Sequence, residues 1–286
     1  MSTHITASIK YVGVDDTDLD LFESQYIIPN GVSYNSYIIL DEKIAIMDSV
    51  DNRKSDEWLG NVESALQGRT PDYLVVQHME PDHAGSIHHI IERFPQMQIV
   101  ASARAIQMLP QFFHDAEFSS RTIAVKEADT LPLGNHTLQF FMAPMVHWPE
   151  VMVTYDQLDK VLFSADGFGK FGALSHSEEW ACEARRYYFN ICGKYGQQVQ
   201  ALLKKMAALD VKKICPLHGP ILSENLDYYI SLYNTWSSYE PEAEGVFIAY
   251  ASIHGGTAKA AEAFAQMLRG RGVEKVSMAD LCRDDM

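Results

Sequence analysis

Short apolar runs, separated by polar turns, dominate the first two thirds of the chain. Residues 33–50 alternate as a hairpin that turns at Asp41 and Glu42, and residues 72–77 form a further buried strand. Three more strands are predicted, of which the last two pair as a hairpin: 136–144, 151–156 and 160–166. Apolar residues recur at helical spacing in four segments, with a short strand at 211–217 between the last two: 86–94, 103–113, 177–208 and 223–239.

The pattern changes after an acidic linker at 239–245 that contains proline and glycine. An apolar strand at 246–251 is followed by a Gly-containing loop, a helix at 258–270 and a strand at 273–279. This order is typical of one β-loop-α-β unit. We therefore predict a first domain at 1–243 and the beginning of a second at 244–286.

Composition and charge narrow the class of protein. The 286 residues are 47% hydrophobic, which supports a substantial core, and 38 acidic against 23 basic residues give a net charge of −15. This charge repels nucleic acid and anionic membranes. No signal sequence and no run of about 18 apolar residues occurs, so we expect a cytoplasmic protein without a membrane span. The four cysteines form no C-x-x-C pair, which argues against a disulfide framework.

Candidate metal ligands gather where predicted strands end. The run "VVQHMEPDHAG" places His78, Glu80, Asp82 and His83 within six positions directly after a strand. Three further candidates also follow apolar strands: His147, Asp166 and His218. Loops at strand ends present chemistry on a rigid scaffold, and imidazole with carboxylate binds first-row metals. The set therefore predicts one metal centre built from four loops.

These motifs resemble the metallo-β-lactamase superfamily, and within it the flavodiiron proteins, also called A-type flavoproteins. The segments "HMEPDHAG", "HWPEVMVTY", "LFSADGFG" and "HGP" look like that family's metal loops, and "YASIHGGTAKAA" is similar to a flavodoxin phosphate loop. Hydrolytic relatives carry H-x-H-x-D-H and zinc, whereas Glu80 replaces the second histidine here. Because a carboxylate is harder and more anionic than imidazole, it favours iron and its ferric states.

The resemblance implies an α/β (α+β) fold, a four-layer αββα domain followed by the start of a flavodoxin-like doubly wound domain. It also implies a diiron site. One iron would take His78, Glu80 and His147, the other Asp82, His83 and His218, and Asp166 would bridge. The sequence leaves the orientation of His83 open, because the equivalent histidine turns away in some members. Tyr26 is expected beside the pocket as an outer hydrogen-bond donor.

The implied activity is reduction of dioxygen to water or of nitric oxide to nitrous oxide. Electrons would come from rubredoxin or an NAD(P)H-linked reductase and pass through FMN, in a head-to-tail homodimer. The residues expected to hold the FMN phosphate are Ser252, Ile253, His254, Gly255, Gly256 and Thr257. A complete flavodoxin-like domain has five parallel strands, and this chain stops at Met286 after two. We therefore expect a C-terminally truncated chain with an incomplete FMN site.

Two other classes of function stay open. One is a dinuclear zinc hydrolase of thioesters or lactams, against which Glu80 and the flavodoxin-like segment argue. The other is a non-catalytic remnant, whose sole support is the stop at Met286. Gly167, Gly169 and Gly172 also spell G-x-G-x-x-G, but no helix is predicted to open at these glycines, which argues against a dinucleotide site.

Overall fold

The computed structural model describes residues 4–114 and 119–284. The chain divides into two compact units, Met1–Ser238 and Tyr239–Met286. Within the described residues, no helix is both long and apolar enough to cross a bilayer.

The first unit contains a sheet of six strands in the order β1-β6-β7-β8-β9-β10. Its strands are β1 (Ile9–Tyr11), β6 (Tyr37–Leu40), β7 (Ile44–Met47), β8 (Tyr73–Val76), β9 (Gln98–Ser102) and β10 (Thr122–Val125). The predicted hairpin at 33–50 is confirmed, since β6 and β7 pair antiparallel with Leu40 opposite Ile44. The pairs from β7 to β10 are all parallel, so the carboxyl ends of these strands lie at one edge of the sheet.

A second sheet of five strands has the order β11-β12-β13-β14-β15. Its strands are β11 (Thr130–Pro132), β12 (Thr137–Met142), β13 (Met152–Asp156), β14 (Val161–Phe163) and β15 (Lys213–Cys215). The hairpin predicted from residues 151–166 is confirmed as the antiparallel pair of β13 and β14. Strand β15 joins β14 in parallel, which brings the two strand ends together although about 50 residues separate them along the chain.

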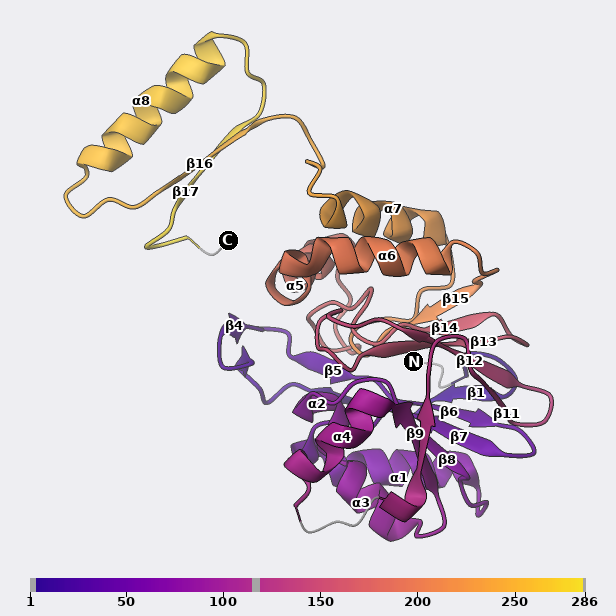
Figure 1. The fold of residues 1–286 in the computed structure, drawn as a ribbon. Coiled ribbons are helices and arrows are strands. Elements are labelled where there is room, and N and C mark those ends of the chain that lie inside the picture. The colour runs from indigo at the N-terminus through magenta and orange to yellow at the C-terminus, as the bar shows by residue number, and fades with distance from the viewer. Residues whose placement is uncertain (1–3, 115–118, 285–286) are drawn as a thin grey trace. The chain divides into compact units, whose positions relative to one another are not determined.

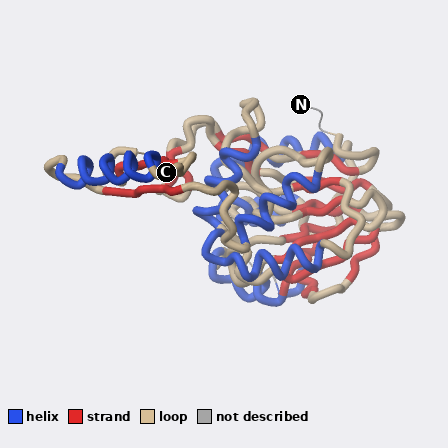
Figure 2. The backbone as a smooth tube through the Cα atoms, turned by 90° about the horizontal axis from the view of Figure 1, so that it is seen from above, coloured by secondary structure: helices blue, strands red, loops and turns tan. Residues whose placement is uncertain are grey.

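The two sheets face each other across an apolar layer. Tyr37, Ile39 and Val75 of the first sheet pack in one cluster with Phe140 and Phe163 of the second. The alternate residues of the same strands belong to another cluster, which the helices complete. This alternation follows from the two-residue period of a strand. Helices therefore cover the outer face of each sheet, in a helix–sheet–sheet–helix arrangement (Figure 1, Figure 2).

Helices α1–α4 lie over the first sheet and α5–α7 over the second (Figure 1). Their bounds are α1 (Ser55–Leu66), α2 (Pro81–Ala84), α3 (Ile87–Arg93), α4 (Ala103–Phe112), α5 (Trp180–Ile191), α6 (Gly196–Met206) and α7 (Leu226–Ser237). The helical pattern at 177–208 is two helices, because the 3₁₀ turn Gly193–Tyr195 separates α5 from α6. Glycine at 193 and 196 weakens a continuous helix there.

Short strands and 3₁₀ turns complete the first unit. They are β2 (Val14–Asp16), β3 (Leu21–Phe22), β4 (Tyr26–Ile27), β5 (Val32–Tyr34), η1 (Asn52–Lys54), η2 (Ser119–Arg121) and η3 (Gly193–Tyr195). Strands β3 and β4 form a small hairpin, with Phe22 opposite Tyr26. Strands β2 and β5 pair antiparallel.

The second unit consists of β16 (Val246–Tyr250), α8 (Gly256–Gly270) and β17 (Val276–Asp280). The two strands are parallel, with Ile248 opposite Met278, so the predicted β-loop-α-β order is confirmed. The identification of this unit as the start of a flavodoxin-like domain stays a prediction. The domain assignment of 1–243 and 244–286 likewise stays a prediction.

Candidate metal centre

The seven predicted ligands converge in the first unit. They form two groups of neighbouring side chains: His78, Glu80, His147 and Asp166; and Asp82, His83 and His218. Each group draws on loops that follow different strands of the two sheets. His78 and Glu80 follow β8, while Asp166 follows β14 and His218 follows β15. The parallel pairing of β14 with β15 explains how residues so far apart in sequence become neighbours.

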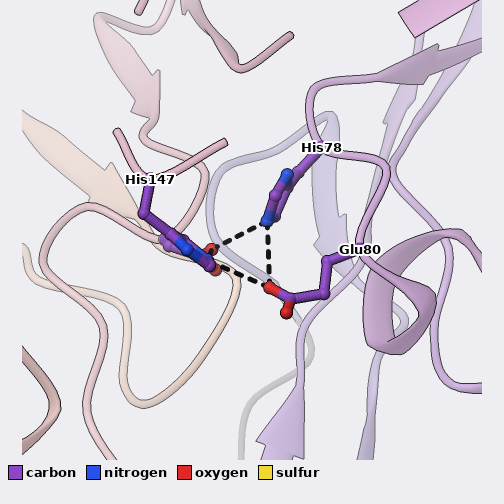
Figure 3. A group of neighbouring side chains, drawn as sticks. His78, Glu80 and His147 are labelled. Atoms are coloured by element: carbon purple, nitrogen blue, oxygen red, sulfur yellow. Dashed lines mark hydrogen bonds and ion pairs between the residues drawn. The ribbon is translucent and has the colours of Figure 1, made fainter. Parts of the chain in front are cut away.

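In the first group, four ligand atoms lie at nearly equal spacing. The Nε2 atoms of His78 and His147 are 3.2 and 3.0 Å from Oε2 of Glu80. The same nitrogens are 3.2 and 3.1 Å from Oδ2 of Asp166. Figure 3 shows His78 and Glu80, from the loop after β8, and His147, from another loop, pointing toward one another. The four atoms therefore surround a common point.

The second group has the same character. Nε2 of His83 and Nε2 of His218 are 3.0 Å apart, and each lies 3.2 Å from Oδ2 of Asp82. Oδ1 of Asp166 is 3.3 Å from the His83 nitrogen and 3.8 Å from the His218 nitrogen. His83 thus points into the group. Because the two oxygens of Asp166 face different groups, this carboxylate has the position of a bridge.

Two observations fit a pair of metal ions. Ligands bonded to one ion at 2.0–2.2 Å and roughly at right angles are ~3 Å apart, which is close to most of the spacings found. Both oxygens of Asp82 and of Asp166 are also buried without a hydrogen-bond partner among the described residues. Unpaired buried carboxylate oxygens are costly, and a cation is the partner that such oxygens lack.

Outer hydrogen bonds fix how the histidines present their nitrogens. Nδ1 of His78 lies 2.8 Å from Oε1 of Glu150, and this oxygen also accepts the Met79 N–H at 2.9 Å. Nδ1 of His218 lies 2.7 Å from the Ser33 carbonyl oxygen and so donates to it. Donation from Nδ1 leaves Nε2, which is aimed into the centre, as the nitrogen that a metal ion can bind. Sequence reasoning missed Glu150 and Ser33, because neither belongs to a local ligand pattern.

The charges of the centre stabilise one another. Burial disfavours the charged form of His147, yet its contacts with Asp166 and Glu80 raise its pKa to about 9. Burial also opposes ionisation of Asp166, but the surrounding imidazoles outweigh it and hold the pKa of this carboxyl well below its usual value. The pKa of Glu80 is lowered for the same reason. The donor set is therefore anionic carboxylate with imidazole, which suits iron or zinc.

The β3–β4 turn brings another carboxyl to the centre. Glu23 and Ser24 both have positive φ, 49° and 57°, and the N–H of Gln25 bonds to the Phe22 carbonyl at 3.0 Å across the turn. This is the geometry of a tight hairpin turn that glycine or asparagine usually occupies. Glu23 hydrogen bonds to Glu80, and burial together with this contact raises its pKa to about 8. No sequence signal pointed to Glu23.

Tyr26, on the same hairpin, packs its ring 6.0 Å from that of Phe171. Its predicted role as an outer donor stays a prediction. Trp148 lies closer to the centre, with its ring edge-on to His78 at 5.3 Å. The aromatic residues therefore form part of the wall around the ligands.

A third candidate group, His136, Asp156 and Asp159, is explained by hydrogen bonding. Nδ1 of His136 lies 2.9 Å from Asp156, and its Nε2 lies 2.7 Å from the Ser8 hydroxyl. The Asp159 N–H donates to the other Asp156 oxygen at 2.8 Å. With these polar atoms paired, the group has the character of a structural cluster.

The predicted phosphate loop, Ser252–Thr257, follows β16 in the second unit and includes the first two residues of α8. The Ser252 hydroxyl accepts the Ala258 N–H at 3.2 Å, and Gly255 has φ 79°. A loop of this kind opens a helix N-terminus, where phosphate binding is favourable. Its role toward FMN stays a prediction. The G-x-G-x-x-G match at 167–172 is followed by turns and bends until α5 begins at Trp180, so no helix opens there.

Comparison with known families and proteins identifies the family of the chain. The model of the ODP family beta lactamase matches residues 32–219, which is more than half of the chain. An uncharacterized protein of Methanocaldococcus jannaschii is 31% identical over 96% of this chain and 70% of its own length. The anaerobic nitric oxide reductase flavorubredoxin of Vibrio vulnificus is 32% identical over 93% of this chain and 56% of its own length. The chain thus spans little more than half of the second relative.

Two solved structures with a similar fold point to the same family. The flavodiiron protein of Giardia intestinalis superposes with a TM-score of 0.90 and 27% identity, over 100% of this chain and 71% of that one. Rubredoxin oxygen:oxidoreductase of Desulfovibrio gigas gives a TM-score of 0.89 and 30% identity, over 98% of this chain and 71% of that one. The chain therefore belongs to the ODP family of the metallo-β-lactamase superfamily, the family of the flavodiiron proteins.

Proposed function

We propose that this protein is a flavodiiron oxidoreductase that reduces dioxygen to water or nitric oxide to nitrous oxide. The observation that carries the proposal is the pairing of two ligand groups that share the two oxygens of Asp166. A dinuclear centre of this kind can bind both atoms of a diatomic ligand. Two iron ions bound there would supply the electrons for its reduction.

The distances support the proposed ligand assignment. His78, Glu80 and His147 would hold one iron together with Oδ2 of Asp166. Asp82, His83 and His218, the second group, would hold the other iron together with Oδ1 of Asp166. Glu80 stands where a zinc hydrolase carries histidine, and its harder oxygen supports iron as the resident metal.

The surrounding residues orient and enclose the ligands. Glu150 accepts from His78 and therefore fixes which ring nitrogen faces the centre. Ser33 does the same for His218 through its carbonyl oxygen. The side chains of His78 and His218 are at most 1% exposed, which limits access of water from their side. The centre is thus held rigidly before any gas arrives.

The substrates and partners are proposed from the relatives' names. The Vibrio vulnificus relative is named a nitric oxide reductase, and the Desulfovibrio gigas structure is named for rubredoxin and oxygen. We propose dioxygen or nitric oxide as the substrate and rubredoxin or an NAD(P)H-linked reductase as the donor. We also propose a diiron domain at 1–243 and a flavodoxin-like fragment at 244–286, in which Ser252–Thr257 would supply only the phosphate part of an FMN site. FMN held by a complete site of this kind would relay electrons in a head-to-tail homodimer.

The test is metal and gas chemistry on one preparation. Protein purified without oxygen and loaded with Fe²⁺ should hold close to two irons per chain and reduce one of the gases with an artificial low-potential donor. Asp166→Asn should lose metal, because the amide removes the anion between the two groups. Asp210→Asn, at a surface ion pair with Lys212, is the matched control. Stoichiometric zinc with thioesterase activity, and iron-loaded protein inert to both gases, would refute the proposal.

A further inference from the structure

Two cavities lie between the second sheet and helices α6 and α7, an inner one that is almost wholly apolar and an outer one that also has Asp210 and Asp227 in its lining. The outer cavity has a volume of about 340 Å³, and the inner one has about 20 Å³. Leu162, Phe168, Leu203 and Met206 line both cavities, so the two are neighbours separated only by these side chains. Neither cavity is lined by a residue of the ligand set.

The inner cavity offers little to water. Its polar lining side chains are those of Ser164 and Tyr233, and each hydroxyl already makes one hydrogen bond within the protein. The Ser164 hydroxyl donates to the Gly167 carbonyl at 2.6 Å, and the Tyr233 hydroxyl accepts the Phe168 N–H at 2.6 Å. A buried water needs two to four polar partners, whereas apolar cavities stay dry and take up xenon or small apolar molecules. The inner cavity is therefore suited to an apolar guest.

The inner cavity lies beside two of the loops that carry candidate metal ligands. Val146, which lines the inner cavity, directly precedes His147. Gly167 and Phe168, which also line it, directly follow Asp166. The cavity therefore borders the backbone of two ligand loops. A molecule held there would contact residues next in sequence to His147 and Asp166.

We propose that the inner cavity is a docking site for an apolar diatomic gas, filled from the outer cavity between α6 and α7. The inner volume of about 20 Å³ exceeds the ~10–15 Å³ that one water molecule needs, so the cavity has room for one small molecule. Dispersion contacts with leucine, valine and methionine side chains favour such a guest and exclude ions. The identity of the gas rests on the proposed function, whereas the existence of the cavity does not depend on it.

Xenon is the probe, because it reports the cavity without any metal or turnover. The full 286-residue chain is titrated with xenon, and its sites are mapped by anomalous diffraction of pressurised crystals or by ¹²⁹Xe chemical shifts. We expect xenon in the inner cavity. Leu203→Trp, which fills the shared wall, should remove it, and Met206→Phe is a milder second variant in case the first unfolds the protein. Lys204→Trp places the same ring on the exposed face of α6 and should leave xenon bound.

The functional arm compares the same variants in the iron-loaded protein. Leu203→Trp should raise KM for the gas several-fold and leave kcat unchanged at saturating gas, since entry is impaired and the chemistry is not. Absence of xenon from the inner cavity overturns the site. Loss of xenon with unchanged kcat/KM overturns its role in gas entry. Failure of the proposed function can be told apart from failure of this inference. In that case the unmodified iron-loaded protein would be inert to both gases, while the xenon map would still decide whether the cavity binds an apolar guest.

Discussion

Removal of the Glu150 carboxylate is expected to weaken one of the two metals selectively. Oε1 of Glu150 accepts from Nδ1 of His78 at 2.8 Å and from the Met79 N–H at 2.9 Å. Glu150 is 1% exposed, so water does not replace it easily. His78 belongs to the first group, whereas His218 in the second group depends on the Ser33 carbonyl. Removal of the Glu150 carboxylate should therefore weaken binding of the metal held by the first group.

The expected magnitude follows from these contacts. Loss of an outer partner of a metal-bound histidine typically weakens metal binding about 10–100-fold, or about 1.4–2.7 kcal/mol. Glu150→Ala removes the one oxygen that accepts both bonds and leaves the Met79 N–H without this partner, so we place it near the upper end. Glu150→Gln keeps a neutral acceptor at the same place and should lie near the lower end.

The assay is an anaerobic Fe²⁺ titration against a chelating indicator. Unmodified protein should bind close to two metals, and Glu150→Ala should give a two-step isotherm in which one site is weakened and the other is kept. Glu127→Gln, at an exposed ion pair with Lys205, is the control for loss of one carboxylate. Equal weakening of both sites, or an unchanged isotherm, would show that Glu150 does not act through His78.

Three further outcomes are expected. Glu80→His recreates the hydrolase motif, so under equal metal supply the site should shift from iron to zinc, and unchanged iron content would contradict this. Burial lowers the pKa of His136, but the contact with Asp156 outweighs burial and raises that pKa above 6.5. The contact therefore stabilises the fold below pH about 6.5, and this stabilisation is lost as the pH rises. The difference in urea midpoint between unmodified protein and His136→Gln should therefore shrink from pH about 6 to about 9, and a growing difference would reverse the sign. Residues 1–286 should purify nearly free of FMN, because the second unit has two described strands and leaves Ile253 91% exposed; stoichiometric FMN absorbance after gel filtration would disprove this.

The strands that carry the centre were predictable because their signal is local. Alternation at 33–50 and the apolar run at 72–77 specify β6, β7 and β8 without reference to the rest of the chain. The ligand candidates were found for a related reason. Each follows an apolar strand, and parallel strands bring such ends to one edge.

The supporting residues were not predictable because their partners are distant. Glu150 meets His78 across 72 residues, and nothing in "HWPE" distinguishes an outer acceptor from a surface carboxylate. Glu23 reaches Glu80 only because two consecutive residues with positive φ turn the β3–β4 hairpin. The break between α5 and α6 depends on packing as well as on Gly193 and Gly196. These features appear only once the tertiary fold is known.

The centre has a polar side and an apolar side, and the two sides suit the passage of different molecules. Among the seven residues, Glu80, Asp82 and His147 keep some exposure, 13%, 12% and 9%, while the others are at most 1% exposed. Glu23 contacts this exposed side through Glu80, so protons and water have polar groups to follow there. The cavity beside Val146 and Gly167 is lined mainly by apolar side chains, which suit a gas. Reduction of dioxygen to water consumes protons and releases a polar product from an apolar substrate. Separate routes would let the gas reach the centre without competing with the water that leaves it.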